Sequence, residues 1–451
     1  LKEAFTPSLP FPLTTPRRSA QTPQRDACPP SAVGHGVGFV GLAGLAIWVM
    51  VARYFHMDGP HAGLAAVFAC GVPMILWSLL VDRVHRRPET GIDWSSPRPL
   101  KEVVDGAIVK LTGLWITWGV IALFYMTGAW YMQGDYRYAV SLLGQGAPVI
   151  VLLSVPYVLW LDRYLIEPRD GAYAFGQWLI GGAAGKPEPG AIANHARSWA
   201  VKAFFLAFML SIVPGNFAGM VTWQAADLWT DPVSLAGFLI ALMFVVDVAF
   251  ATTGYILTMK PLDAHIRTAN PLLSGWVAAL ICYPPFVLMG PGGPLFYEVD
   301  TRGWDYWFAG HEALLWAWGA LLVLLTGVYA WATVAFGLRF SNLTHRGILT
   351  HGPYRISKHP AYLAKNAFWW CSVMPFLVTT GSIETGVRNA LLLAITSGVY
   401  YWRARTEEAH LGADPVYRDY AAWMERNGLV PRFLALLTGK RRPQAEIQPA
   451  E

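Results

Sequence analysis

The feature that most constrains this chain is a series of about ten apolar runs, most of them roughly 18–25 residues long. A helix of about 20 apolar residues is long enough to cross the hydrocarbon core of a bilayer. Only 14% of the 451 residues are charged, whereas soluble domains carry about 25%. We therefore predict an all-α fold, a polytopic bundle of transmembrane helices. The runs lie near residues 37–55, 63–81, 109–131, 148–165, 200–220, 235–257, 272–289, 313–337, 367–380 and 387–402.

The distribution of Lys and Arg between the runs predicts the orientation of the bundle. Basic residues gather in every second loop, and the loops between them hold few. Cytoplasmic loops of membrane proteins carry an excess of Lys and Arg, so we expect both termini and the basic loops in the cytoplasm, with the protein in a bacterial inner (plasma) membrane. The ninth run is short, and with the tenth it predicts a helical hairpin that need not span fully. The basic loops are 83–110, 163–202, 260–267, 339–365 and the chain after 403.

Composition excludes some classes of site and partner. The four cysteines are scattered, with no closely spaced pair, so neither a disulfide framework nor a metal site is expected. The net charge of +5 is small and lies mostly in loops, so nucleic acid is not expected as a partner.

Two polar residues interrupt the sixth run. Asp247 lies in its middle, and Tyr255 follows two turns later on nearly the same helix face. An ionisable group at membrane depth is costly and usually faces the protein interior or a wet cavity. Two interpretations remain open: a structural hydrogen bond to a neighbouring helix, or contact with a substrate and supply of a proton.

The first polar block, residues 339–362, lies between two apolar runs. Its Gly and Pro residues predict a loop, and Pro360 suits the first turn of the next helix, which places His359 at the N-cap. The free N–H groups of that helix start could bind an anionic or polar group of a ligand. The rings of Tyr354 and Tyr362 could attract a sulfonium or ammonium cation.

The second polar block, residues 403–432, predicts a helix that passes from apolar to polar surroundings. Arg403 and Glu407 are four residues apart and share a face, with Glu408 beside them. The glutamates could bind a ribose or balance a cationic cofactor. The competing interpretation is a salt bridge at the membrane boundary.

The two blocks together carry a family resemblance. The pattern GPYRxxxHPAY, an apolar hairpin and then RxxxEExxL, YxxY and VPR resembles the isoprenylcysteine carboxyl methyltransferase family and the related phospholipid methyltransferases, over about residues 337–434. The resemblance implies S-adenosylmethionine bound at the cytosolic face and an acceptor that arrives from the bilayer. It implies that the cofactor is bound by Leu349, Gly352, Tyr354, His359, Pro360 and Tyr362 on one side and by Glu407, Glu408 and Tyr417 on the other.

The sequence departs from the family pattern in three places. Lys358 stands where Arg usually precedes the His-Pro pair, Lys365 and Asn366 stand where small or apolar residues are common, and some eight further runs precede the motif. We expect recognition of the acceptor to fall on Lys365, Asn366 and the added helices, with Asp247 and Tyr255 as further candidates.

The chain is accordingly divided into four parts. Residues 1–33, rich in Pro, Ser, Thr and Arg, predict a flexible cytoplasmic tail, and 436–451 a second one. Residues 34–310 form an N-terminal transmembrane bundle that faces lipid and the acceptor. Residues 311–435 form the methyltransferase-like catalytic region.

Methyl transfer needs mainly alignment of the acceptor with an already activated methyl group. A carboxylate acceptor requires a nearby cation, and Arg355, Lys365 or Arg403 could supply one. An amine, thiol or hydroxyl acceptor must lose a proton, and His359 or Glu408 could accept it. The sequence leaves these alternatives open.

Two other functions compete with methyl transfer. The integral-membrane sterol reductases have about ten segments and a similar HPxY region, so the chain also resembles an NADPH-dependent reductase, with Asp247 or Tyr255 as proton donor. A non-enzymatic lipid-binding or transport scaffold is the third interpretation. All three predict a lipid or isoprenoid ligand, and the oligomeric state stays open.

Overall fold

The computed structural model describes residues 27–181, 188–223, 228–429, 432–433 and 437. Residues 1–26 of the first predicted tail, and all of the second except residue 437, lie outside the described residues. The helices are α1 His35–Tyr54, α2 Pro60–Leu80, α3 Leu100–Gly128, α4 Arg137–Asp162, α5 Gly171–Ile180, α6 Pro189–Thr222, α7 Pro232–Ile256, α8 Leu273–Leu280, α9 Trp304–Trp307, α10 Glu312–Phe336, α11 Pro360–Val373, α12 Ile383–Leu411 and α13 Pro415–Asn427. The strands β1 Thr268–Ala269 and β2 Thr344–His345 form one antiparallel pair.

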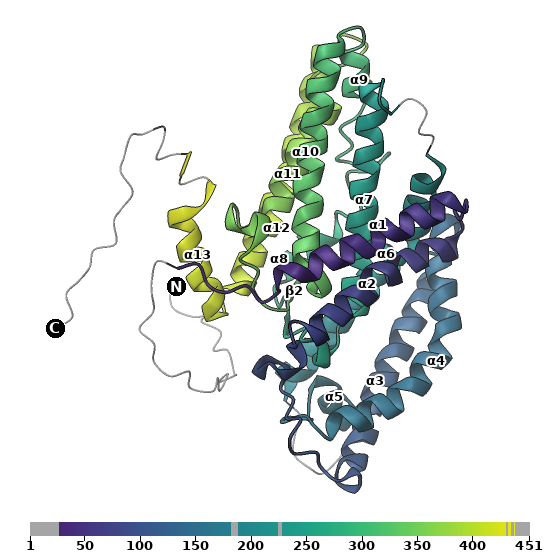
Figure 1. Cartoon of the computed structure of the whole chain (residues 1–451), viewed down its shortest axis with the longest axis vertical. Helices are drawn as coiled ribbons and strands as arrows, with labels where there is room; N and C mark the ends of the chain where they lie inside the picture. Colours follow the sequence, from purple (N-terminus) through teal and green to yellow (C-terminus); the bar gives the residue numbers. More distant parts are fainter. Residues whose placement is uncertain (1–26, 182–187, 224–227, 430–431, 434–436, 438–451) are drawn as a thin grey trace, which may run out of the picture.

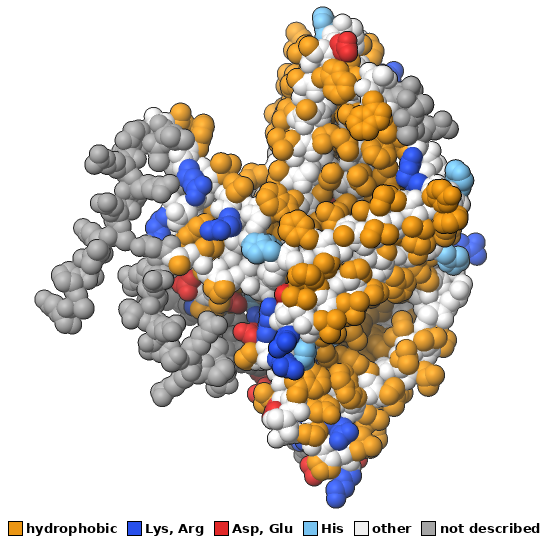
Figure 2. Space-filling model, in the orientation of Figure 1, with side chains coloured by type: hydrophobic (Ala, Val, Ile, Leu, Met, Phe, Trp, Pro, Cys, Tyr) orange, Lys and Arg blue, Asp and Glu red, His pale blue; other side chains and the backbone are white. Residues whose placement is uncertain are grey.

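The described residues confirm the prediction of an all-α bundle. Seven of their helices, α1, α2, α3, α4, α6, α7 and α10, are long and apolar enough to cross a membrane. Figure 1 shows α7, α10, α11 and α12 standing upright together, with α1, α2 and α6 inclined across them and α3, α4 and α5 beyond. Hydrophobic side chains cover the faces of these helices in Figure 2, as lipid-facing surfaces require.

The predicted number of ten segments is not confirmed. The run 272–289 forms only the eight-residue helix α8 and then turns, because Pro284 and Pro285 lack the N–H groups that a continuing helix needs. The predicted hairpin at 367–402 is formed by α11 and α12. With 14 residues α11 is too short to cross a bilayer, and the 29-residue α12 is not among the seven apolar helices.

The chain after α8 runs beside α12 without forming a long helix. Near the start of this segment the ring of Tyr283 lies 5.7 Å from the guanidinium carbon of Arg403. Near its end the carbonyl of Val299 accepts a hydrogen bond from Asn389 at 2.7 Å. Since Arg403 lies 14 positions after Asn389 in the same helix, this irregular segment extends along about 20 Å of α12.

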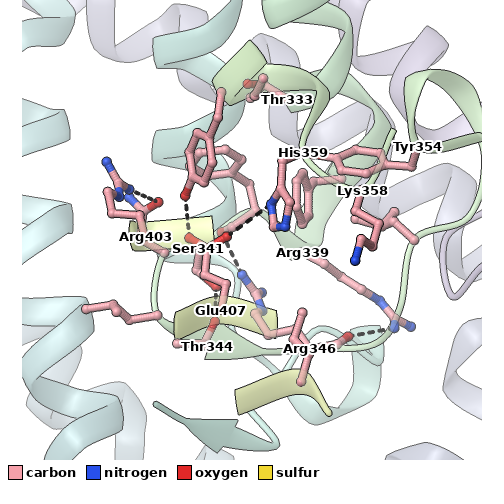
Figure 3. Close-up of a pocket in the computed structure, with 18 of the residues that line it drawn as sticks. Thr333, Arg339, Ser341, Thr344, Arg346, Tyr354, Lys358, His359, Arg403 and Glu407 are labelled. Atoms are coloured by element: carbon pink, nitrogen blue, oxygen red, sulfur yellow. Dashed lines mark hydrogen bonds and ion pairs between the residues drawn. The ribbon is translucent and has the colours of Figure 1, made fainter. Parts of the chain in front are cut away.

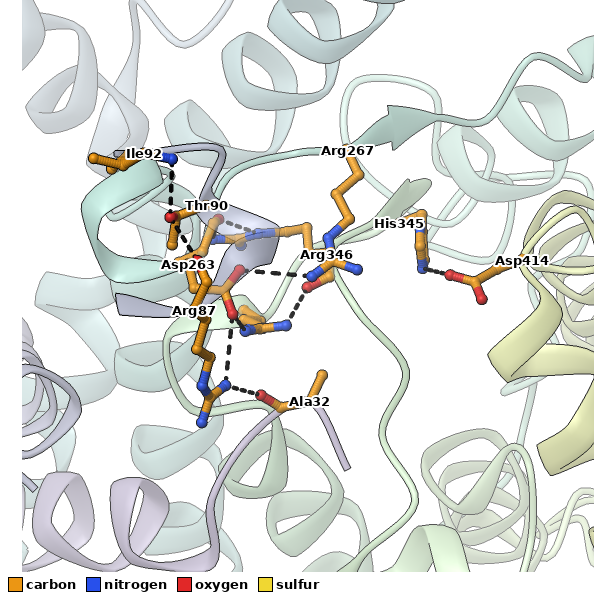
Figure 4. A network of polar contacts seen from close by, with 11 residues as sticks. Ala32, Arg87, Thr90, Ile92, Asp263, Arg267, His345, Arg346 and Asp414 are labelled. Atoms are coloured by element: carbon orange, nitrogen blue, oxygen red, sulfur yellow. Dashed lines mark hydrogen bonds and ion pairs between the residues drawn. The ribbon is translucent and has the colours of Figure 1, made fainter. Parts of the chain in front are cut away.

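Loops that the charge pattern places on one side of the membrane do meet. Asp263, in the loop after α7, forms ion pairs with Arg339 at 2.5 Å, Arg87 at 3.5 Å and Arg267 at 3.5 Å. Arg87 also donates to the carbonyl of Ala32 at 2.9 Å. Figure 4 shows this network joining the start of the described chain to the loops after α2, α7 and α10. The meeting agrees with the predicted alternation of the loops.

The first polar block is fixed by Arg346. Its buried guanidinium donates to main-chain carbonyls at the C-terminal ends of α7 and α10 and in the loops that follow them. Cations are favourable at such helix ends, where the last carbonyls lack partners within the helix. The end of α7 approaches this block closely, since a Cβ on Gly254 would lie 2.5 Å from the carbonyl oxygen of Phe340. The acceptors are the carbonyls of Gly254, Leu257, Ala264, Leu338 and Phe340.

Candidate functional site

A cavity lies between the first polar block and the helices α10, α11 and α12. It contains about 1250 Å³ of space free of atoms, part of it open to solvent. Figure 3 shows Tyr354, His359, Arg403 and Glu407 around this space. Both predicted polar blocks therefore contribute to a single cavity.

The start of α11 positions two of the predicted residues. The helix begins at Pro360 with His359 as its N-cap, as the sequence predicts. Tyr362 lies three residues further, and its ring stacks on that of His359 with centroids 5.7 Å apart and planes only 2° from parallel. The two rings form one aromatic wall of the cavity.

The glutamate pair of α12 contacts that wall. His359 donates from Nε2 to Oε1 of Glu408 at 3.1 Å, and Lys358 Nζ lies 2.8 Å from the same oxygen. Tyr362 donates its hydroxyl to Oε1 of Glu407. The hydrogen bonds from His359 and Lys358 lower the pKa of Glu408 from 4.5 to about 2, so Glu408 is ionised at neutral pH.

Arg403 forms the next part of the wall. Its guanidinium carbon lies 5.1 Å from the ring centroids of both Tyr362 and Tyr400, and 5.7 Å from that of Tyr283. Nη2 donates to Oδ1 of Asn342 at 3.3 Å. The buried Nε of Arg403 and Nδ2 of Asn342 have no hydrogen-bond partner among the described residues. Two residues of the cavity wall thus contain a buried N–H donor without an acceptor among the described residues.

Lys365 lies deeper in the bundle, on the same face of α11 as Tyr362. Its ammonium lies 5.3 Å from the ring centroids of Tyr329 and Trp369 and 5.8 Å from that of Tyr400. Within the part of the chain that the structure describes, this ammonium has aromatic neighbours but no hydrogen bond or ion pair. It lines the cavity, where it can meet an anionic or polar oxygen.

Asp247 lies behind the deep end of the cavity. Its carboxylate accepts hydrogen bonds from Tyr329 at 2.6 Å and from Thr333 at 2.5 Å, both on α10. The predicted structural bond to a neighbouring helix is therefore present. Asp247 does not line the cavity, whereas Tyr329 and Thr333 do. The hydroxyl of Tyr255 is also behind the wall, where it accepts the backbone N–H of Asn342 at 2.8 Å.

The remaining predicted residues divide into two groups. Leu349, Tyr354 and Tyr417 line the cavity. The other group does not line it. Arg355 in particular is exposed, because it ends a short turn that directs the chain towards solvent before α11, so the structure does not place its cation beside an acceptor. The residues outside the lining are Gly352, Arg355, Pro360, Asn366 and, at the rim, Glu408.

Several wall residues were missed by sequence reasoning. Tyr283 follows the turn after α8, and Tyr329 lies in an apolar run without any motif. Tyr400 could have been predicted, since it precedes Arg403 by three residues and therefore lies on the same helix face. Asn342 lay inside the first polar block but carried no pattern of its own.

The described cavity wall combines aromatic rings with one carboxylate, that of Glu407, and several cationic side chains. Among the described residues, no group of three or more His, Cys, Asp or Glu side chains could hold a metal ion. Rings and the Glu407 carboxylate are instead the groups that attract a sulfonium or ammonium. Comparisons with protein-family models, curated proteins and solved structures give no match to this chain.

Proposed function

We propose that this protein is an integral-membrane, S-adenosylmethionine-dependent methyltransferase that acts on a lipidic or isoprenoid acceptor at the cytoplasmic face. The observation that supports it most is the contact of Tyr362 with Glu407, which brings the His-Pro turn and the glutamate pair into one aromatic-walled cavity. Carboxylate and ring faces together suit a ligand that carries a sulfonium and a ribose.

Apart from Arg403 and Lys365, the basic residues in the cavity wall are already paired, which favours this cofactor over NADPH. A ribose phosphate binds best to free Arg or Lys groups. Arg346 is occupied by main-chain carbonyls and Arg339 by Asp263, while Lys358 is paired with Glu408. Arg355 is exposed outside the cavity.

When bound, S-adenosylmethionine would supply an activated methyl group. The chain's own residues would orient and enclose the reactants. Tyr354, Tyr362 and Glu407 would hold the cofactor, and Arg403 would separate it from the deep end at Lys365. Alignment of reactants in a site shielded from water provides much of the acceleration that methyl transfer needs. The apolar helices around the cavity provide surroundings in which a lipid tail is stable.

One observation favours the reductase as a second candidate. Tyr329 lines the deep end of the cavity and is hydrogen-bonded to the buried Asp247. Such a pair could donate the proton that reduction of a carbon–carbon double bond requires. This candidate predicts binding of NADPH in place of S-adenosylmethionine.

Calorimetry on the purified protein in detergent separates the two candidates. The parent protein should bind S-adenosylmethionine and not NADPH, and Glu407→Gln should weaken binding about tenfold, or ~1.4 kcal/mol, because the carboxylate that balances the cation is lost. Glu384→Gln is a matched control, since this exposed glutamate lies at the opposite end of α12. Binding of NADPH alone would refute the proposal.

A further inference from the structure

The deep end of the cavity contains a proton acceptor within reach of its wall. Asp247 is 7% exposed, and its carboxylate oxygens accept hydrogen bonds from the hydroxyl groups of Tyr329 and Thr333. Tyr329 lines the cavity on one side and contacts the carboxylate on the other. An ionisable group at membrane depth is costly and is usually retained for a function.

The same end contains N–H donors that lack acceptors. The ammonium of Lys365 lies beside the ring of Tyr329 and has no acceptor among the described residues. The Nε of Arg403 and the Nδ2 of Asn342 are buried and unpartnered in the same described set. Buried donors are almost always satisfied, so the two buried donors of Arg403 and Asn342, with the cavity-lining ammonium of Lys365 near them, indicate that an oxygen atom of a ligand belongs there.

The Tyr329–Asp247 pair and the N–H donors without acceptors together favour one class of methyl acceptor. An amine acceptor must react as the neutral amine and becomes positively charged as its nitrogen bonds to the methyl group, and Lys365 and Arg403 would oppose that charge. A carboxylate acceptor is already ionised, needs no base and would be repelled by an ionised Asp247. A hydroxyl fits both, because it must lose a proton and its oxygen becomes negative in the transition state, where N–H donors and cations stabilise it.

We propose that the methyl acceptor presents a hydroxyl group on an apolar lipid body, bound between Lys365 and Arg403, with Tyr329 and Asp247 removing its proton. This inference rests on the methyltransferase function proposed above. Tyr329 is the catalytic residue, since it contacts the acceptor, and Asp247 is a positioning residue that acts through it.

The step balances in atoms and charge. The acceptor oxygen uses a lone pair to form a bond to the methyl carbon, and the carbon–sulfur bond breaks with both electrons passing to sulfur, which becomes a neutral thioether. The hydroxyl proton passes to the oxygen of Tyr329 while the proton of Tyr329 passes to Asp247. Asp247 thus becomes a carboxylic acid, and loss of that proton to water restores the starting state.

Three probes with the same tail test the acceptor class: a farnesyl-substituted phenol, the corresponding benzoate and the corresponding benzylamine, each in phosphatidylcholine vesicles with the full chain. Transfer of a radiolabelled methyl group should occur to the phenol at least about tenfold faster than to the other two. The phenol should also bind in the absence of cofactor, as measured by calorimetry, and Lys365→Met should weaken that binding.

Three variants test the proton path. Tyr329→Phe and Asp247→Asn should each lower kcat for the phenol about 100-fold, the low end of the effect of general bases, with KM little changed. Thr333→Val is the matched variant, because it removes an equivalent hydrogen bond to Asp247 and leaves Tyr329 in place, and it should cost less than about tenfold. The parent should show a solvent deuterium isotope effect on kcat, and Asp247→Asn should alter it.

The results distinguish a wrong assignment of the hydroxyl acceptor from a wrong assignment of the methyltransferase function. If S-adenosylmethionine does not bind, the proposed function fails and the inference with it. If it binds but the benzoate or the benzylamine is methylated as fast as the phenol, or none of the three is methylated, the hydroxyl assignment is overturned. If Thr333→Val lowers kcat as much as Asp247→Asn, Asp247 is only a tether between α7 and α10.

Discussion

Arg346 joins the ends of two membrane helices to the loops beneath the cavity, and replacing it with methionine tests how much that junction contributes. Methionine fills most of the space of the arginine stem but donates no hydrogen bond. The change would leave buried carbonyls without their partner at Gly254, Leu257, Ala264, Leu338 and Phe340.

The cost follows from the number of carbonyls affected. A buried polar group that loses its partner costs about 1–3 kcal/mol. At the low end of that range, loss of all five contacts lowers the free energy of unfolding by about 5 kcal/mol. Since proteins are stable by only about 5–15 kcal/mol, we expect Arg346→Met to be poorly folded at ambient temperature. Arg346→Lys keeps the charge and three donors, so it should lose less.

Denaturant unfolding in detergent micelles, followed by helical circular dichroism, measures the loss. Arg355→Met is the matched control, because Arg355 is exposed, and it should change the unfolding free energy by less than about 0.5 kcal/mol. A loss below about 1 kcal/mol for Arg346→Met would refute the reasoning, since the carbonyls would then be satisfied in another way.

Two further predictions concern charged groups. The hydrogen bonds from His359 and Lys358 lower the pKa of Glu408 to about 2, so the stability that ionised Glu408 contributes is complete above pH 4.5 and is lost as the pH falls towards 2. The difference in unfolding temperature between the parent and Glu408→Gln should therefore shrink on acidification. An unchanged difference would contradict this account of the Glu408 pKa. Asp263→Leu removes the partner of the buried Arg339, which should cost about 3–5 kcal/mol in the same denaturant assay, whereas the exposed Asp419→Leu should cost little.

Local features of the fold were predictable from the sequence. Seven apolar runs correspond to long helices because an apolar helix of that length satisfies its own main-chain groups in lipid. The start of α11 at Pro360 was also predictable, since proline is favoured in the first turn and His359 could act as the cap. The long helices and the start of α11 could be predicted because each depends only on residues that are close together in the sequence.

The structure of the run 272–289 could not be predicted from its apolar composition. Its composition is as apolar as that of a spanning helix, but Pro284 and Pro285 prevent the helix from continuing, and α8 ends at Leu280. Whether such a run spans depends on which neighbours can shield its main chain. That information belongs to α12 and to the aromatic residues around Phe286, which are distant in sequence.

Only part of the candidate site could be predicted, because some of its residues lie in sequence motifs and others come from distant segments. The motifs contained His359, Tyr362 and Glu407, and the structure brings these together. Tyr283 and Tyr329 come from segments without a motif, and they reach the cavity only through packing of whole helices. Arg355 lies within the motif but is exposed, since the side of a short turn that faces solvent is not fixed by residue type.

The irregular segment between α8 and α9 has a consequence for biosynthesis. A stretch of main chain with unpaired N–H and C=O groups cannot partition into lipid by itself as it leaves the ribosome. Its groups gain partners such as Tyr131, which donates to the carbonyl of Pro284 at 2.6 Å, and Asn389 of the later α12. The carbonyl of Val299 therefore gains its partner from α12 only after that later helix has been synthesised.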